Sequence, residues 1–159
     1  MKELAKIAAI RGEERAKKEG AANYKAQVYK SASSTTCPVD EYKGADKVAL
    51  KAKIKQAWEA DKKCCNQCKI LKIYITGEKW ERSKGYDGSN STNTYRYYDE
   101  SLLSVEVVWQ ATNAEFKEEI ATIASYSLIK DNTDGGSVMY TDDHCNKMNA
   151  GKMLIANIK

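Results

Sequence analysis

The chain has 159 residues, of which 42% are hydrophobic and 30% charged, a length and balance that suit one globular domain with a core of its own. No apolar run approaches the roughly 20 residues that a membrane helix needs, so we expect no transmembrane segment. The apolar stretch that begins at Met1 is broken by Lys6 and followed by Arg11, Glu13 and Glu14. This pattern matches no secretory signal peptide.

Two helices are predicted in the first part of the chain. Residues 1–20 place Leu4, Ile7 and Ala8 on one stripe and end at Gly20. A polar connector containing Pro38 follows up to Lys43. Asp46 can cap a second helix that runs to about Lys63, with one apolar stripe formed by Leu50, Ile54, Ala57 and Trp58. We therefore divide the chain into an N-terminal helix and connector, 1–45, and a single domain, 46–159.

The hydrophobic period changes from 3.6 to 2 after the second helix, as expected for strands. Residues 69–76 and 101–111 alternate most clearly, and residues 80–83 predict a short neighbouring strand. The run from Gly85 to Asn93 contains turn-forming residues and predicts a loop. Residues 115–130 fit a helix or a strand, and we favour the strand because they are rich in β-branched and other poor helix formers. Short closing strands are predicted at 137–141 and 153–158.

This order predicts an α+β fold, in which N-terminal helices pack on a curved antiparallel sheet of four to six strands. Trp109 shares a face with Leu103, Val105 and Val107, so we expect it in the core, with Trp58 packed against the same sheet. A helix carrying Ala57-Trp58, followed by the run Lys69–Trp80 and long paired strands, resembles the NTF2-like or cystatin-like layout of small exported bacterial domains. The resemblance covers residues 46–159 and implies a concave sheet face that could hold a ligand.

Five cysteines are present, an odd number, and three of them lie within five residues. Cys65 and Cys68 form one C-x-x-C knuckle, but a matching second zinc knuckle is missing because Cys145 stands next to His144. We favour disulfide bonds over unpaired thiols or bound zinc, and hence an extracytoplasmic location, periplasmic or secreted. The disulfide candidates are Cys37, Cys64, Cys65, Cys68 and Cys145.

No catalytic constellation is evident, because the chain has one histidine and no nucleotide loop or nucleophile elbow. The adjacent His144 and Cys145 favour a surface loop over a catalytic dyad. NTF2-like enzymes commonly use a His/Asp pair inside the sheet, and no such pair maps onto these strands. We therefore predict no catalytic residue, no metal ligand and no cofactor.

Aromatic residues are the best candidates for binding. Tyr95-Arg96-Tyr97-Tyr98 alternates aromatic rings with a cation, which suits stacking on a partner, although tyrosine is also an ordinary strand residue. The candidate ligand-binding residues are Trp80, Tyr95, Tyr97, Trp109 and Tyr126.

The basic residues are concentrated in the first half of the chain. Residues 1–72 hold 17 Lys and Arg against 9 Asp and Glu, whereas residues 73–159 hold 9 against 13. The lysines are spread around the predicted helices and almost no arginine accompanies them there, so we expect no specific nucleic-acid binding.

The functional hypothesis is a small exported binding or protein-interaction domain without catalytic activity. Its partner would be another protein, including a second copy of the chain, or a small ligand. The alternative is an NTF2-like ligand-binding or enzymatic domain that uses the concave face of the sheet.

Overall fold

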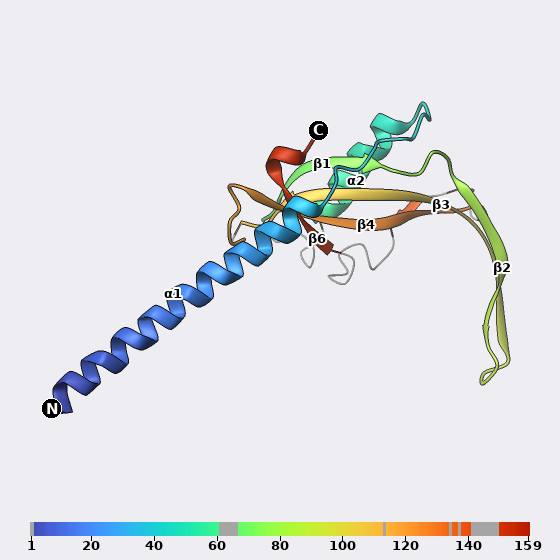
Figure 1. Ribbon diagram of the computed structural model, residues 1–159. Coiled ribbons are helices and arrows are strands. Elements are labelled where there is room, and N and C mark those ends of the chain that lie inside the picture. Colours follow the sequence, from blue (N-terminus) through green and yellow to red (C-terminus); the bar gives the residue numbers. More distant parts are fainter. Residues whose placement is uncertain (1, 61–66, 113, 134, 137, 141–149) are drawn as a thin grey trace.

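The computed structural model describes residues 2–60, 67–112, 114–133, 135–136, 138–140 and 150–159. Two helices precede an antiparallel sheet, which confirms the predicted α+β class (Figure 1). The elements are α1 (Lys2–Ser34), α2 (Lys47–Ala60), β1 (Lys69–Ile75), β2 (Glu81–Ser89), β3 (Thr94–Gln110), β4 (Ile120–Asp131), β5 (Val138–Tyr140), β6 (Ala150–Leu154) and a short 3-10 helix, Ile155–Asn157.

The long strand β3 lies at the centre of the sheet. One edge of β3 pairs with β1 along its C-terminal half and with β2 along its N-terminal half, and the other edge pairs with β4. The strands β5 and β6 pair with opposite ends of β4. Because β4 begins to pair with β3 at Glu100, the β2–β3 hairpin extends beyond the rest of the sheet.

The main core lies between α2 and one face of the sheet. Leu50, Ile54 and Trp58 are the buried residues of α2, as the periodicity predicted. Trp58 is 1% exposed, and its ring lies 5.0 Å from that of Trp109, which is 9% exposed. These contacts confirm that the two tryptophans are core partners.

A smaller cluster covers the opposite face of the sheet. It contains Tyr74, Val108, Ala121, Ile123 and Met153, with residues of the α1–α2 connector and the C-terminal segment packed against it. Both faces of the sheet are therefore covered where β1, β3 and β4 lie side by side.

The connector between the helices is fixed by Asp40. Its carboxylate accepts hydrogen bonds from the ammonium group of Lys51 and from the N–H of Ile75, and forms an ion pair with Lys47. Partial burial raises the pKa of Asp40, but these hydrogen bonds outweigh it and hold that pKa below its ordinary value. Asp40 thus joins α2 to β1.

The prediction that the first helix ends at Gly20 is wrong, because α1 continues to Ser34. Gly20 is exposed and tolerated within the helix, at a cost of about 1 kcal/mol relative to Ala. The C-terminal part of α1 gains contacts that the local sequence does not reveal. The rings of Tyr24 and Tyr29 lie 6.3 and 6.0 Å from that of Phe116, and Ala32 is fully buried.

The predicted loop at 85–93 is also wrong, since residues 85–89 belong to β2 and the turn is confined to 90–93. The favoured strand at 115–130 is confirmed from Ile120 onwards, whereas the residues before it form a turn. The last strand, β6, runs from Ala150 to Leu154, whereas the closing strand was predicted at 153–158. Sequence periodicity located these last two strands and misplaced their ends.

Replacing Trp58 with Ala should lower the free energy of unfolding by about 3–5 kcal/mol, because a large buried ring leaves a cavity against Trp109. Urea unfolding measures this change. Val48 lies on the same helix and is 81% exposed, so Val48→Ala is the matched control and should change stability by less than about 0.5 kcal/mol. Equal effects of the two substitutions would show that α2 does not hold the sheet.

Candidate functional site: the tyrosine ribbon

Three of the five predicted binding residues belong to the core side of the sheet. Trp109 and Tyr126 both pack against Trp58, with ring centroids 5.0 and 5.5 Å from it. Trp80 packs against the same cluster, and its indole N–H donates a hydrogen bond to Tyr42 at 3.2 Å. These side chains hold α2 and the connector on the sheet.

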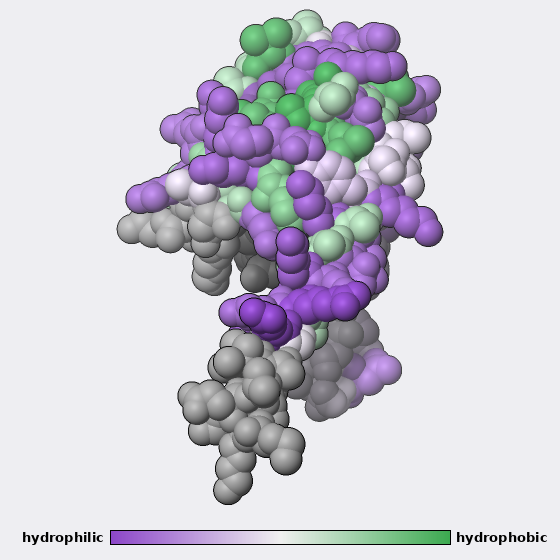
Figure 2. All heavy atoms as spheres, turned by 60° about the vertical axis from the view of Figure 1, so that its left-hand side comes forward, coloured by the Kyte–Doolittle hydropathy of each residue, from purple (hydrophilic) through white to green (hydrophobic). Residues whose placement is uncertain are grey.

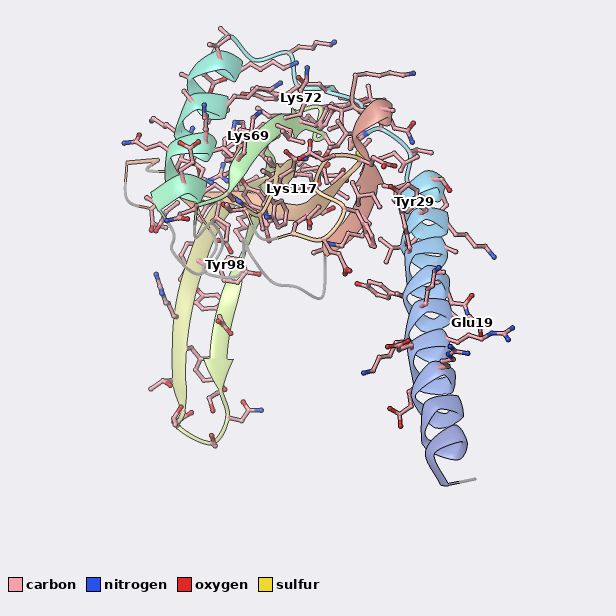
Figure 3. All side chains as sticks on the ribbon, turned by 90° about the vertical axis from the view of Figure 1, so that its left-hand side faces the viewer. Glu19, Tyr29, Lys69, Lys72, Tyr98 and Lys117 are labelled. Carbon is pink, nitrogen blue, oxygen red and sulfur yellow. The ribbon has the colours of Figure 1, made fainter. Side chains whose placement is uncertain are left out.

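The other two candidates, Tyr95 and Tyr97, lie on the hairpin that extends beyond the sheet. We call residues 83–99, the outer part of β2 and β3 with their turn, the tyrosine ribbon. It curves away from the sheet, and it projects to the same side as α1 (Figures 1 and 3). The sequence pattern missed Tyr86, which becomes a neighbour of Tyr97 through the pairing of β2 with β3.

Most of the aromatic surface of the ribbon is open to solvent. Tyr86 is 75% exposed, Tyr95 61% and Tyr97 48%, whereas Tyr98 is half-buried. Such a group of exposed rings contrasts with the largely hydrophilic surface that Figure 2 shows on the described part of α1. Contiguous exposed aromatic side chains commonly mark contact surfaces.

Tyrosine packing across the ribbon explains why a sequence rich in Gly, Ser and Asn forms strands here. Tyr86 and Tyr97 are direct cross-strand partners, with ring centroids 5.4 Å apart in an edge-to-face arrangement. Tyr98 lies opposite Gly85 in the strand pairing. A Cβ added to Gly85 would lie only 3.0 Å from the hydroxyl oxygen of Tyr98. Gly85 therefore provides the space in which the ring of Tyr98 lies.

The base of the ribbon is held by a polar network around Asp99. This carboxylate accepts hydrogen bonds from two guanidinium nitrogens of Arg82 and from the side-chain amide of Asn132, which also donates to Ser101. The backbone N–H of Asn132 donates to the carbonyl of Asp99. The hydrogen bonds from Arg82 and Asn132 lower the pKa of Asp99 to about 2.

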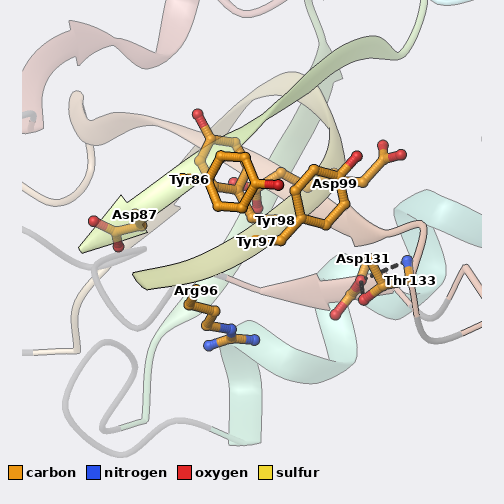
Figure 4. Close-up of a pocket in the computed structure, with 9 residues that line it drawn as sticks. Tyr86, Asp87, Arg96, Tyr97, Tyr98, Asp99, Asp131 and Thr133 are labelled. Atoms are coloured by element: carbon orange, nitrogen blue, oxygen red, sulfur yellow. Dashed lines mark hydrogen bonds between the residues drawn. The ribbon is translucent and has the colours of Figure 1, made fainter. Parts of the chain in front are cut away.

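A cavity of about 420 Å³ lies beside the ribbon, where β4 stops pairing with β3 (Figure 4). Its lining includes four carboxylates, among them Glu100 and its direct cross-strand partner Asp131. The side chain of Asp131 also closes a turn by accepting hydrogen bonds from the N–H and hydroxyl of Thr133. The lining residues are Tyr86, Asp87, Arg96, Tyr97, Tyr98, Asp99, Glu100, Asp131 and Thr133.

A second cavity, of about 710 Å³, lies between the connector and the C-terminal segment. The Cys37 thiol donates to the hydroxyl of Tyr74 at 3.2 Å, and that hydroxyl donates to the carbonyl of Lys159 at 3.0 Å. Burial and the contact with Cys37 raise the pKa of Tyr74 to about 12, so this phenol stays protonated at neutral pH. The arrangement ties the C-terminus to β1.

The predicted sulfur chemistry falls mostly outside the described residues, where Cys64, Cys65, His144 and Cys145 all lie. Cys37 is a free thiol in the structure, and Cys68 packs against the main core. Within the described ranges, no group of three or more His, Cys, Asp or Glu side chains is placed to hold a metal ion. In that same part of the chain, no helix is long and apolar enough to cross a membrane.

Comparison of the chain with protein-family models, with curated proteins and with solved structures finds no match. The ribbon is therefore assigned as the candidate site from the geometry of its strands and of its base alone.

The network at Asp99 makes stability depend on acidity. Because the pKa of Asp99 is lowered from 3.8 to about 2 on folding, its stabilising contribution is present above pH 3.8 and is lost as the pH falls towards 2. Asp99→Asn should therefore narrow the difference in urea midpoint between pH 7 and pH 2.5. Asp87→Asn, an exposed position on the same ribbon, is the control that should keep the wild-type difference. An unchanged pH dependence in Asp99→Asn would contradict this assignment.

Proposed function

We propose that this chain is a small protein-interaction domain without catalytic activity, and that the tyrosine ribbon is its binding element. The observation that carries the proposal is the exposure of Tyr86, Tyr95 and Tyr97 on a hairpin that extends past the rest of the sheet. A surface of this kind gives a partner protein rigid aromatic rings with polar hydroxyl ends.

Tyrosine suits this role for a physical reason. Its side chain has two rotatable angles, so it provides a large contact area at a small cost in conformational entropy. The cross-strand contact of Tyr86 with Tyr97, and the hydrogen bond from the Tyr95 hydroxyl to Asn90 at 3.0 Å, already order the rings before binding. Preordered aromatic residues are typical of interface positions that dominate affinity.

The alternative is an NTF2-like domain that binds a small ligand, or acts on one, at the concave face of the sheet. The face of the sheet that carries Trp109 and Tyr126 is covered by α2, because Trp58 packs against both of these rings. A ligand there would have to displace a core side chain. The observations thus favour the ribbon over the sheet face, and the NTF2-like relationship itself remains a proposal.

We also propose that the domain is exported and that its clustered cysteines form intramolecular disulfides. The support is the clustering of the cysteines in the sequence, of which Cys68 packs against the main core, whereas Cys37 is a free thiol. Protein purified from an oxidising compartment should gain about 2 Da per disulfide on reduction, as measured by intact mass with thiol labelling. Labelling before reduction should modify Cys37. Five free thiols in such protein, or one zinc ion per chain, would contradict the prediction.

The interaction proposal is tested by replacing Tyr86 and Tyr97 with Thr, a residue that keeps strand propensity but removes the ring. The double variant should lose the proteins that the wild-type chain captures from an extract of its own source, with at least about a tenfold loss of affinity for a purified partner. Its melting temperature should stay near that of the wild type, because the ribbon lies outside both core clusters.

Tyr24→Thr is the matched control, since Tyr24 is 52% exposed but lies on α1, away from the ribbon. The control should retain the captured proteins. Undiminished capture by the double variant would place the binding surface elsewhere. The alternative function would be favoured if the double variant loses capture and a small molecule also raises the melting temperature of the wild-type chain.

A further inference from the structure

The turn at the far end of the tyrosine ribbon carries a modification motif. Asn90-Ser91-Thr92 is the single place in the sequence where an asparagine is followed by a residue other than proline and then by serine or threonine. This tripeptide is the acceptor pattern for N-linked glycans, which lie on the surface of exported proteins. So short a motif also arises by chance, and only an exposed copy in a turn or loop is a usable acceptor.

The structure places the whole motif in solvent. Residues 90–93 form the turn between β2 and β3, and all three residues of the motif are exposed. The ribbon extends beyond the rest of the sheet, so this turn lies outside both core clusters (Figures 1 and 3). A bulky, hydrated glycan attached there would displace no core side chain, and exposed loop tips are the places that best tolerate added groups.

The turn is held by contacts among its own residues. The N–H of Thr92 donates to the carbonyl of Ser89 at 3.2 Å, which closes a β-turn with Asn90 and Ser91 at its central positions. The hydroxyl of Thr92 also donates to that carbonyl, at 3.4 Å, and lies 2.7 Å from the hydroxyl of Thr94. An enzyme that binds this hydroxyl therefore breaks no contact with the core.

The amide nitrogen of Asn90 is available for reaction. The amide oxygen accepts a hydrogen bond from the hydroxyl of Tyr95 at 3.0 Å, whereas the nitrogen has no hydrogen-bond partner among the residues that the structure describes. The nitrogen is the atom to which an N-linked glycan is joined. The contact with Tyr95 thus leaves the reactive atom free and places the tyrosine ring beside the attachment point.

We propose that Asn90 is an N-glycosylation site. The co-reactant is a lipid-diphosphate-linked oligosaccharide, presented by a transferase of the secretory compartment. The amide nitrogen of Asn90 bonds to C1 of the first sugar and gives up a proton to a base of the transferase. The bond from C1 to the diphosphate oxygen breaks, and the lipid diphosphate leaves with its electron pair. This inference rests on the proposed export of the domain and adds a modification to its binding element.

The glycan would divide the ribbon into two parts. Its first sugar would lie beside Tyr95, which is 61% exposed and contacts the acceptor side chain. The C–H groups of a sugar ring gain dispersion contacts when they pack on an aromatic ring. Tyr86 and Tyr97 pair with each other further from the turn. The glycan would therefore cover Tyr95 and leave the pair of Tyr86 and Tyr97 open to a partner protein.

The test begins with the full chain isolated from its own source. Mass spectrometry should find the peptide that contains Asn90 carrying a glycan, and a peptide-N-glycosidase should release the glycan and convert Asn90 to Asp. Four variants produced in the same source locate the acceptor. Asn90→Gln and Thr92→Ala should lose the glycan. Ser91→Ala and Thr92→Ser keep the acceptor pattern in the same turn and should retain it.

Tyrosine nitration tests the position of the sugar. Enzymatic removal of the glycan from the folded chain should make Tyr95 react faster with tetranitromethane. Tyr86 is the matched control, since it is 75% exposed on the same ribbon, and its rate should stay the same. Capture of partner proteins through Tyr86 and Tyr97 should also persist after the glycan is removed.

An unmodified Asn90 peptide in protein that carries disulfide bonds would overturn the glycosylation site and leave the proposed export standing. The same peptide in protein with all its cysteines free would overturn both. A glycan that persists in Asn90→Gln would place the modification on another residue and so overturn the assignment. Equal nitration of Tyr95 before and after glycan removal, or loss of capture on removal, would overturn the division of the ribbon.

Discussion

The register of β3 is the constraint on which the rest of the structure depends. This strand continues for 17 residues from the exposed ribbon into the core, and its pairing with β2 and β4 is regular. Burial of Leu103, Val105 and Val107 against α2 fixes which residues face the helix. A slip by one residue would move all of them to the opposite face, so the core also determines where the rings of Tyr95 and Tyr97 lie.

The sequence predicted the parts of the fold that depend on local periodicity. The stripe of α2 and the alternation ending at Trp109 each identify a buried face without knowledge of the partner element, and the two faces meet as expected. The C-terminal extension of α1 was not predictable in this way. It depends on Phe116, which is far away in the sequence and reaches Tyr29 through the β3–β4 turn.

The candidate site was predictable in part for a similar reason. Tyr95 and Tyr97 stand out because aromatic residues alternate in the chain, but the surrounding Gly, Ser and Asn residues indicate a loop when they are read locally. Packing of a tyrosine over a glycine on the next strand is a cross-strand effect, as with Tyr98 and Gly85. The acidic cavity likewise depends on where β4 ends, which no local pattern specifies.

The long helix α1 has a consequence for distance. It is joined to the sheet near its C-terminal end, where Phe116 adopts a left-handed backbone conformation (φ 59°) that places its ring against Tyr24 and Tyr29. At 1.5 Å per residue, its 33 residues span about 50 Å. A helix of this length would therefore hold its N-terminal end at a set separation from the ribbon, which a flexible tether of equal length would not do.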